Sequence, residues 1–207
     1  LVFMLGAVIL GAGLSRRMGS EKLLLPIGRK RILEKTIDSV AESFENFESV
    51  IVIVTREAVL NGIETRKGVI YLVNDQPELG QSTSLKIAVA YLAKHYPECQ
   101  GILVFLGDQP LVSKELAGKI EQVITKNPMS IIMPEYRGQK GHPVAFGKCW
   151  FKELLKVSGD AGGRGIIKKH PEVLIKIQGD RTCVMDADTP EDYQRLLEYY
   201  EKEWAEN

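Results

Sequence analysis

The chain has 207 residues, of which 44% are hydrophobic and 26% charged, values typical of a soluble globular protein. Lysine plus arginine equals aspartate plus glutamate at 27 each, so the charge balance does not indicate a surface for nucleic acid or membrane. Three widely spaced cysteines without a C-x-x-C pair argue against a disulfide framework or a structural zinc site and favour a reducing compartment, the cytoplasm.

Short apolar runs rich in β-branched residues alternate with longer amphipathic stretches, and the first run favours a buried strand over a signal peptide because it lacks a basic flank. The predicted strands are Ala7–Leu10, Val50–Thr55, Val69–Val73, Ile102–Leu106, Ser130–Met133, Pro143–Phe146, Val173–Ile177 and Cys183–Met185. The predicted helices are Ile32–Phe44, Thr83–His95, Lys114–Lys126, Trp150–Lys156, Gly165–Lys169 and Pro190–Glu203. This alternation predicts an α/β fold with a mostly parallel sheet covered on both faces, in one domain spanning residues 1–207.

Residue types at two helix starts and around one polar loop add detail to this pattern. Ser113 is predicted to cap the helix that follows it, and Thr189, followed by Pro190 and two acids, is predicted to cap the last helix. The regularity weakens after residue 130, where two strands come close around the loop Glu135–His142. We therefore expect an antiparallel insertion around residues 130–170 that forms part of a substrate lid. Ligands of such sheets bind beyond the carboxyl ends of the strands, so the residues that follow each strand are candidates for chemistry.

The segment GAGLSRRMGSEK, residues 11–22, follows the first predicted strand. It has neither the G-x-x-x-x-G-K-[ST] of a Walker A loop nor the third glycine of a G-x-G-x-x-G dinucleotide fingerprint. What remains is a close-approach glycine turn with the cations Arg16, Arg17 and Lys22 and the hydroxyl of Ser15, which suits a triphosphate. The alternative for this loop alone is a solvated basic loop whose glycines serve a tight turn.

Asp108 follows the predicted strand Ile102–Leu106 in the sequence Gly-Asp-Gln-Pro. A carboxylate at the end of a buried strand is costly unless it is paired or bound to metal, and Mg²⁺ takes one or two carboxylates together with substrate phosphate oxygens. Asp186 and Asp188 follow another predicted strand and are candidates for a second ligand, with Asp188 favoured. The alternatives are that Asp108 caps a helix or shapes a turn, and that one of the other two acids caps the last helix.

Together these segments resemble the motifs of the MobA-like nucleotidyltransferase family. ILGAGLSRRMGSEKLLLPIGRKRIL resembles the family signature L-x-A-G-x-S-x-R-M-G-x-x-K-x-L-L-P, and GDQP at 107–110 resembles its G-D-[MQ]-P motif. VNDQPELGQSTSL at 73–85 is similar to its base- and ribose-binding segment. KGHPVAF at 140–146, GDAGGRGII at 159–167 and DADTPEDY at 186–193 resemble later motifs of the molybdopterin cytidylyltransferase branch. The resemblance runs through nearly the whole chain and keeps the order of the motifs.

This resemblance implies a Rossmann-like three-layer sandwich with a mixed sheet, and transfer of CMP from CTP to the terminal phosphate of molybdopterin, with release of pyrophosphate. The cofactor it implies is Mg²⁺, with Mn²⁺ as an alternative. By position it implies the nucleotide-binding residues Leu10, Gly11, Ala12, Gly13, Ser15, Arg17, Lys22, Asn74, Gly80, Ser82, Ser84 and Asp108. It implies catalytic roles for Arg17, Lys22 and Asp108, metal binding by Asp108 with Asp188 or Asp186, and pterin contacts by His142, Asp160 and Arg164.

The sequence leaves open which nucleotide the chain uses and which phosphate accepts it. The GTP-using branch tends to have two glycines at the positions of Ala12 and Gly13, so the chain is nearer the CTP branch, but Gly11 departs from the usual alanine and keeps GTP as an alternative. Transfer to another phosphate, such as that of a sugar or an isoprenoid alcohol, and a non-catalytic module that delivers cofactor are the competing functions. The predicted partners are CTP or another NTP, molybdopterin, and transiently an apo molybdenum hydroxylase, with neither nucleic acid nor membrane.

Overall fold

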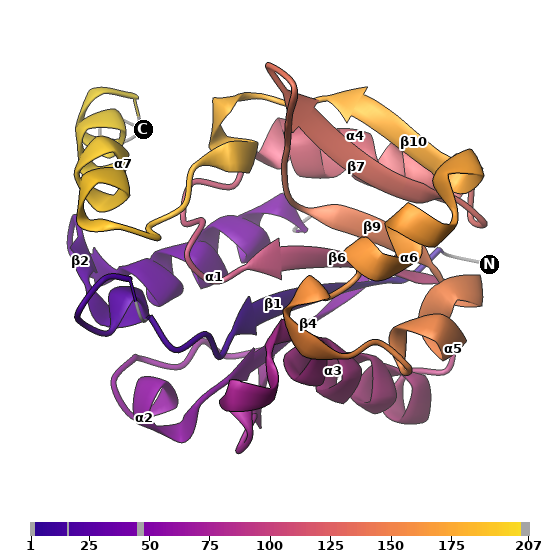
Figure 1. Cartoon of the computed structure of the whole chain (residues 1–207), viewed down its shortest axis with the longest axis horizontal. Coiled ribbons are helices and arrows are strands. Elements are labelled where there is room, and N and C mark those ends of the chain that lie inside the picture. The colour runs from indigo at the N-terminus through magenta and orange to yellow at the C-terminus, as the bar shows by residue number, and fades with distance from the viewer. Residues whose placement is uncertain (1–2, 16, 45–47, 204–207) are drawn as a thin grey trace.

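The structure is a computed structural model that describes residues 3–15, 17–44 and 48–203. Its centre is one sheet with the strand order β10-β7-β9-β6-β1-β4-β5, and β8 pairs with β7 (Figure 1). These strands are β1 (Leu5–Gly11), β4 (Ser49–Thr55), β5 (Val69–Val73), β6 (Gly101–Leu106), β7 (Ile131–Tyr136), β8 (Gln139–Lys140), β9 (Val144–Gly147) and β10 (Leu174–Gln178). A small hairpin of β2 (Pro26–Ile27) and β3 (Lys30–Arg31) stands apart from this sheet.

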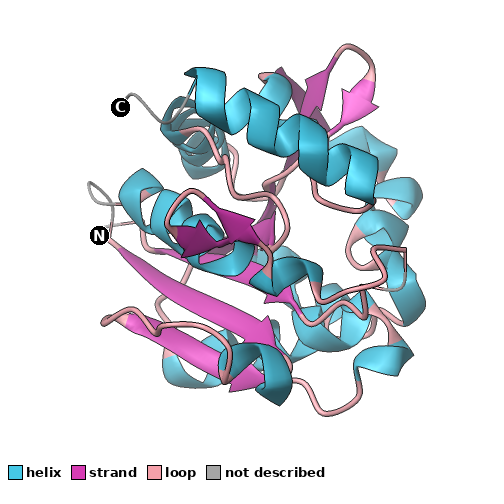
Figure 2. Ribbon diagram, turned by 90° about the vertical axis from the view of Figure 1, so that its left-hand side faces the viewer, coloured by secondary structure: helices cyan, strands magenta, loops and turns pink. Residues whose placement is uncertain are grey.

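Helices lie on both sides of the sheet (Figure 2). They are α1 (Ile32–Ser43), α2 (Glu57–Leu60), α3 (Gln81–His95), α4 (Lys114–Lys126), α5 (Phe151–Leu154), α6 (Arg164–Lys169) and α7 (Pro190–Glu203). Short 3₁₀ turns are η1 (Lys22–Leu24), η2 (Pro77–Leu79), η3 (Lys148–Trp150), η4 (Gly159–Ala161), η5 (Pro171–Val173) and η6 (Arg181–Val184). None of the helices in the described part of the chain has both the length and the apolar character needed to cross a membrane.

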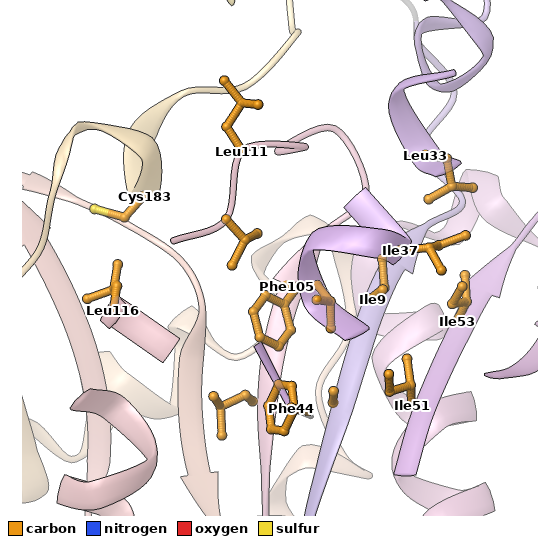
Figure 3. Close-up of a cluster of buried hydrophobic side chains, with 14 of the residues drawn as sticks. Ile9, Leu33, Ile37, Phe44, Ile51, Ile53, Phe105, Leu111, Leu116 and Cys183 are labelled. Carbon is orange, nitrogen blue, oxygen red and sulfur yellow. The ribbon is translucent and has the colours of Figure 1, made fainter. Parts of the chain in front are cut away.

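Neighbouring residues of the central strands belong to two separate apolar clusters. Ile9 of β1 and Phe105 of β6 lie in the cluster that includes side chains of α1, α4 and α7 (Figure 3). Val8 and Val104, one position earlier on the same strands, lie in the cluster that includes side chains of α3, α5 and α6. Successive side chains of a strand point to opposite faces, so strands buried on both faces must be apolar at every position. The prediction of a three-layer α/β fold is confirmed.

The sheet changes direction beyond β6, where antiparallel strands were predicted. β1 pairs in parallel with β4 and β6, whereas β9 is antiparallel to both β6 and β7, and β7 forms a hairpin with β8. Gly138, with φ +81°, allows the tight turn of this hairpin. β10 then joins the edge of the sheet in parallel with β7. The sheet is therefore mixed, as predicted, while the role of this region as a lid stays a prediction.

The predicted strand Cys183–Met185 is wrong, because Cys183 and Val184 lie in the 3₁₀ turn η6 and Met185 follows its end. Asp180 caps the turn, since its Oδ1 accepts hydrogen bonds from the backbone N–H and the hydroxyl of Thr182. A short polar side chain that satisfies local N–H groups favours a turn over a strand, even where the residues themselves are apolar. The carbonyl oxygen of Cys183 accepts a bond of 2.9 Å from the N–H of His142, which ties the turn to the loop before β9.

The two predicted helix caps are present, while several short elements were missed. The hydroxyl of Ser113 accepts a bond from the N–H of Leu116 at the start of α4. Thr189 accepts from the N–H of Asp192, and the Asp192 carboxylate accepts from the N–H of Thr189, which is a reciprocal capping box at α7. The predicted helix Trp150–Lys156 is shorter, and α2, β2, β3 and β8 were not predicted.

Candidate functional site

A cleft of about 420 Å³ lies at the carboxyl ends of β1 and β6, where ligands of open α/β sheets bind. The predicted site residues that line it are Leu10, Gly11, Ala12, Gly13, Ser15, Arg17, Lys22, Gly80, Ser84, Asp108, Asp160, Arg164, Asp186 and Asp188. Three others, Asn74, Ser82 and His142, are not among its lining residues. Arg16, the third predicted cation of the loop, lies outside the described residues. Residues separated by more than 170 positions therefore meet in one cleft.

The fold itself does not require glycine at positions 11 and 13 of the first loop, whereas Gly19 has φ +72°. A Cβ on Gly13 would meet no atom of the described chain within 4 Å, and one on Gly11 would make only ordinary contacts at 3.5 Å. Neither residue has the positive φ that favours glycine. Gly107 differs, because its Cβ would lie 3.1 Å from the Leu10 carbonyl oxygen and the Gly11 Cα. The tight-turn alternative thus has no support at Gly11 and Gly13, and close approach of a ligand stays the prediction for both.

Three charged side chains meet at the floor of the cleft. The ammonium Nζ of Lys22 lies 2.5 Å from Oδ2 of Asp108 and 2.6 Å from Oδ1 of Asp188, and Arg17 binds the other oxygen of Asp188 at 2.5 Å. The side chains of Lys22 and Asp108 are only 13% and 12% exposed, whereas Arg17 is 71% exposed. The Lys22 ammonium is therefore a largely buried cation between two carboxylates, and Arg17 is an exposed cation beside it.

Backbone contacts explain why these acids converge. The Asp108 carbonyl oxygen accepts a bond of 3.2 Å from the N–H of Ala187, which holds the segment of Asp186 and Asp188 beside the end of β6. Two buried hydroxyls of α1 hold the turn that carries Asp108, since Thr36 donates to the Gly107 carbonyl and Ser39 donates to the Pro110 carbonyl, both at 2.8 Å. Backbone contacts of the fold therefore determine where the carboxylates of Asp108 and Asp188 lie.

The pKa values of Asp188 and Asp186 shift in opposite directions. Burial alone would lower the pKa of Lys22, but attraction and hydrogen bonding to Asp108 and Asp188 raise it overall. Burial alone would raise the pKa of Asp188, but Lys22 and Arg17 lower it overall. Asp186 behaves differently: burial, and then the nearby Asp108 and Asp188, outweigh the attraction of Lys22 and raise its pKa to about 6. Asp188 is consequently the stronger candidate for a permanently charged ligand, and Asp186 holds a proton under mildly acidic conditions.

The donor set suits a hard cation. Asp108 and Asp188 present carboxylate oxygens to one point, now held by the Lys22 ammonium, and oxygen is the donor that Mg²⁺ and Mn²⁺ prefer. Within residues 3–15, 17–44 and 48–203, no three His, Cys, Asp or Glu side chains form a metal-binding group. Mg²⁺ needs no such protein cage, because it takes one or two carboxylates and completes its shell with water and phosphate. These residues therefore fit a metal shared with a bound nucleotide.

The glycine-rich segment around η4 packs on the start of α3. A Cβ on Gly80, which has φ +92°, would lie 2.5 Å from the carbonyl carbon of Gly159. The hydroxyl of Ser82 accepts a bond of 3.2 Å from the N–H of Gly162, and Ser82 is fully buried. This contact brings Asp160 to the cleft, and the Gly162 bond explains why Ser82 does not line it.

Asn74 and His142 also have structural partners. The Asn74 amide donates to the Ser84 hydroxyl at 2.9 Å and its oxygen accepts from the N–H of Gln76, so it shapes the turn after β5. The ring of His142 has a pKa lowered to about 4, by burial and then by the positive charge of Arg164. His142 is therefore a neutral ring near Arg164 and is not among the residues that line the cleft.

Six lining residues were missed at the sequence level: Leu14, Leu23, Pro77, Glu78, Gln81 and Leu106. Glu78 and Gln81 flank the predicted Gly80 and line the cleft from η2 and the first turn of α3. The available signal was their place just after a strand, in the segment already assigned to base and ribose binding.

The family model of the MobA-like NTP transferase domain matches residues 7–173. The chain belongs to this family. Its relatives include the molybdenum cofactor cytidylyltransferase of Escherichia coli K12, with 27% identity over 93% of this chain and 95% of that protein. A probable molybdenum cofactor guanylyltransferase of Natranaerobius thermophilus is 30% identical over 64% of this chain and 60% of its own length.

A solved structure with the same fold contains manganese. It is the complex of Rv0371C from Mycobacterium tuberculosis H37Rv with manganese, which has a TM-score of 0.79 and 26% identity over 96% of this chain and 100% of that one. Divalent metal use in a homologue agrees with the oxygen donors of Asp108 and Asp188.

Proposed function

We propose that the chain transfers CMP from CTP to the terminal phosphate of molybdopterin and releases pyrophosphate. The observation that carries this proposal is the convergence of Lys22, Asp108 and Asp188 with the glycine turn of β1 in one cleft. A buried cation between two carboxylates beside an exposed backbone loop supports binding of a triphosphate with a metal ion.

The reaction needs positioning and neutralisation of charge rather than a protein nucleophile. The acceptor phosphate attacks the α-phosphorus of the nucleotide in line, the α–β phosphoanhydride bond breaks, and pyrophosphate leaves with the bonding electrons. Lys22 and Arg17 are placed to neutralise the phosphates, and the glycine turn of Gly11 and Gly13 leaves open space for the nucleoside. His142 does not line the cleft, so the proposed mechanism assigns it no role as general base.

Mg²⁺, or Mn²⁺ in its place, would be held by Asp108 and Asp188 and would supply charge neutralisation at the phosphates when bound. Asp188 is preferred to Asp186 because its carboxylate already faces the same point as that of Asp108. Binding there requires the Lys22 ammonium to leave the two carboxylates for the phosphates of the nucleotide.

CTP is proposed as the substrate in preference to GTP because of Ala12. This residue lines the cleft at a position where the GTP-using branch tends to have glycine. An added methyl group narrows the space for a base, which disfavours a purine more than a pyrimidine. The cytidylyltransferase relative covers nearly the whole chain, and the guanylyltransferase relative covers a smaller part of it at similar identity, so the assay must include both nucleotides.

The acceptor is proposed to enter on the side of η4 and α6. Asp160 and Arg164 line this side of the same cleft, and the Arg164 guanidinium can bind a phosphate through two parallel hydrogen bonds. The pterin itself would then face polar groups that can bind its ring nitrogens.

Pyrophosphate release with each of the four NTPs and purified molybdopterin tests this proposal. Release with CTP only is the expected result, and release with GTP only would reassign the base. Release only with another phosphate acceptor, such as a sugar phosphate, would reassign the second substrate. NTP binding without release for any acceptor would favour a delivery module that hands cofactor to an apo molybdenum hydroxylase.

A further inference from the structure

Two successive residues at the carboxyl end of β4 hold the carbonyl groups of the glycine turn. The hydroxyl of Thr55 donates to the Gly11 carbonyl at 2.7 Å, and Nη2 of Arg56 donates to the Gly13 carbonyl at 3.2 Å. β4 is the direct neighbour of β1, so its last residues reach the loop that follows β1. Neither Thr55 nor Arg56 is among the residues that line the cleft.

Arg56 also holds the other end of the same loop. Its Nη2 binds Oε2 of Glu21, and Oε1 of Glu21 accepts a bond of 3.0 Å from the hydroxyl of Ser15. The same hydroxyl accepts a bond of 3.3 Å from the N–H of Lys22. One guanidinium therefore connects the glycine turn with the residue that precedes the cation of the cleft.

These bonds set the direction of the backbone N–H groups. A trans peptide is planar, so a carbonyl that points toward β4 turns the N–H of the next residue away from β4. The residues that follow Gly11 and Gly13 are Ala12 and Leu14, and both line the cleft. Thr55 and Arg56 thus turn two N–H donors of the loop toward the side where the nucleotide is proposed to bind.

Two features of this hydrogen-bond network are energetically unfavourable by themselves: the backbone conformation of Ser15 and the burial of the Arg56 guanidinium. Ser15 has φ +50°, a left-handed conformation that a serine seldom adopts without local hydrogen bonds. Nε of Arg56 is buried without a hydrogen-bond partner in the described part of the chain. A buried donor without a partner is unfavourable, so the bonds of Arg56 to Glu21 and the Gly13 carbonyl must offset this cost.

We infer that Arg56, acting through Glu21 and the Gly13 carbonyl, is a positioning residue that fixes loop 11–22 for the triphosphate substrate. This inference rests on the proposed function, because it assigns Arg56 a role in NTP binding. Arg56 does not touch the substrate, and its effect is transmitted by the loop backbone and by Ser15.

The test compares Arg56→Met, Arg56→Lys, Glu21→Gln and the double variant Glu21→Gln/Arg56→Met with wild type. Arg66→Met is the matched control, since Arg66 also forms an ion pair, with Asp38 at 2.7 Å, and lies away from the cleft. Binding of a non-hydrolysable CTP analogue, and of a GTP analogue, is measured by calorimetry, KM is measured for each substrate, and the melting temperature is recorded.

Arg56→Met is expected to weaken NTP binding about tenfold or more, which is the size of effect expected for losing one charge-assisted hydrogen bond. The KM for NTP should rise by the same factor. The KM for the acceptor should stay within about twofold of the wild-type value. The melting temperature of this variant is expected to match that of Arg66→Met. Arg56→Lys recovers part of the affinity because the charge is kept, and the double variant is no weaker than Arg56→Met because both residues act in one network.

Three results would overturn the inference. Unchanged NTP affinity in Arg56→Met while wild type binds NTP would refute it and leave the proposed function intact. An equal rise in both KM values, together with a lower melting temperature than the control and no recovery by Arg56→Lys, would assign a purely structural role. Wild type that binds no NTP would remove the proposed function and this inference with it.

Discussion

Replacing Asp186 with asparagine is expected to stabilise the fold above pH 6 and to have little effect near pH 4. Burial and the neighbouring Asp108 and Asp188 raise the pKa of Asp186 from 3.8 to about 6. The folded chain therefore binds this proton more tightly than the unfolded chain, and stability falls as pH rises from 3.8 to 6. Above pH 6 the full cost of ionising Asp186 in the cleft is present, and asparagine removes it.

The size of this effect follows from the distance between the two pKa values. Each pKa unit corresponds to 1.36 kcal/mol, so a gap of roughly two units amounts to about 3 kcal/mol. Asp186 is only partly buried, and solvent screening lowers this to about 1–2 kcal/mol. The gain should be seen in the absence of divalent metal, because a bound cation would itself offset the charge of Asp186.

Urea unfolding of Asp186→Asn and wild type at pH 4, 6 and 8, in the presence of a chelator, measures this difference. Asp75→Asn is the control, because Asp75 is exposed and does not line the cleft. The unfolding free energies of variant and wild type should converge at pH 4 and separate at pH 8. A gain of equal size at both pH values, or a loss of stability at pH 8, would refute the electrostatic account.

Three further outcomes are expected from the same site. Asp108→Ala should lower turnover by about 10²-fold or more while the circular dichroism spectrum stays unchanged, and near-normal turnover would remove Asp108 from the metal site. Chelation should stop pyrophosphate release and Mg²⁺ or Mn²⁺ should restore it; activity that survives chelation would contradict the metal. His142→Gln should leave the pH dependence of kcat/KM between pH 6 and 8 unchanged, since its pKa is about 4 and the ring stays neutral there.

The central strands could be predicted because each of their residues is buried on one face or the other. Val8 and Ile9 illustrate this, since adjacent positions enter different clusters and both must be apolar. Cys183 could not be placed by the same rule, because its burial comes from packing against Gly141 and Gly179 rather than from a strand. An apolar run shorter than four residues carries no period from which a strand can be told from a turn.

The site was less predictable than the fold because its geometry depends on contacts distant in sequence. Lys22 and Asp188 are 166 positions apart, and they meet where the backbone of Ala187 is hydrogen-bonded to that of Asp108. Arg56 gave no sequence signal, because a charged residue after a strand is typical of solvent exposure. Its role became visible only when the order β1-β4 placed it beside the glycine turn.

The charges of the cleft give a physical reason to expect a metal with the nucleotide. Lys22 and Arg17 already form ion pairs with Asp108 and Asp188, so the charges of these four side chains balance one another. A triphosphate adds several negative charges to this balanced set, and drawing Lys22 toward it leaves two carboxylates without a counterion. A divalent cation that arrives with the nucleotide would neutralise both the carboxylates of Asp108 and Asp188 and the phosphates. Before the cation binds, the proton that Asp186 holds up to about pH 6 limits the negative charge of the cleft.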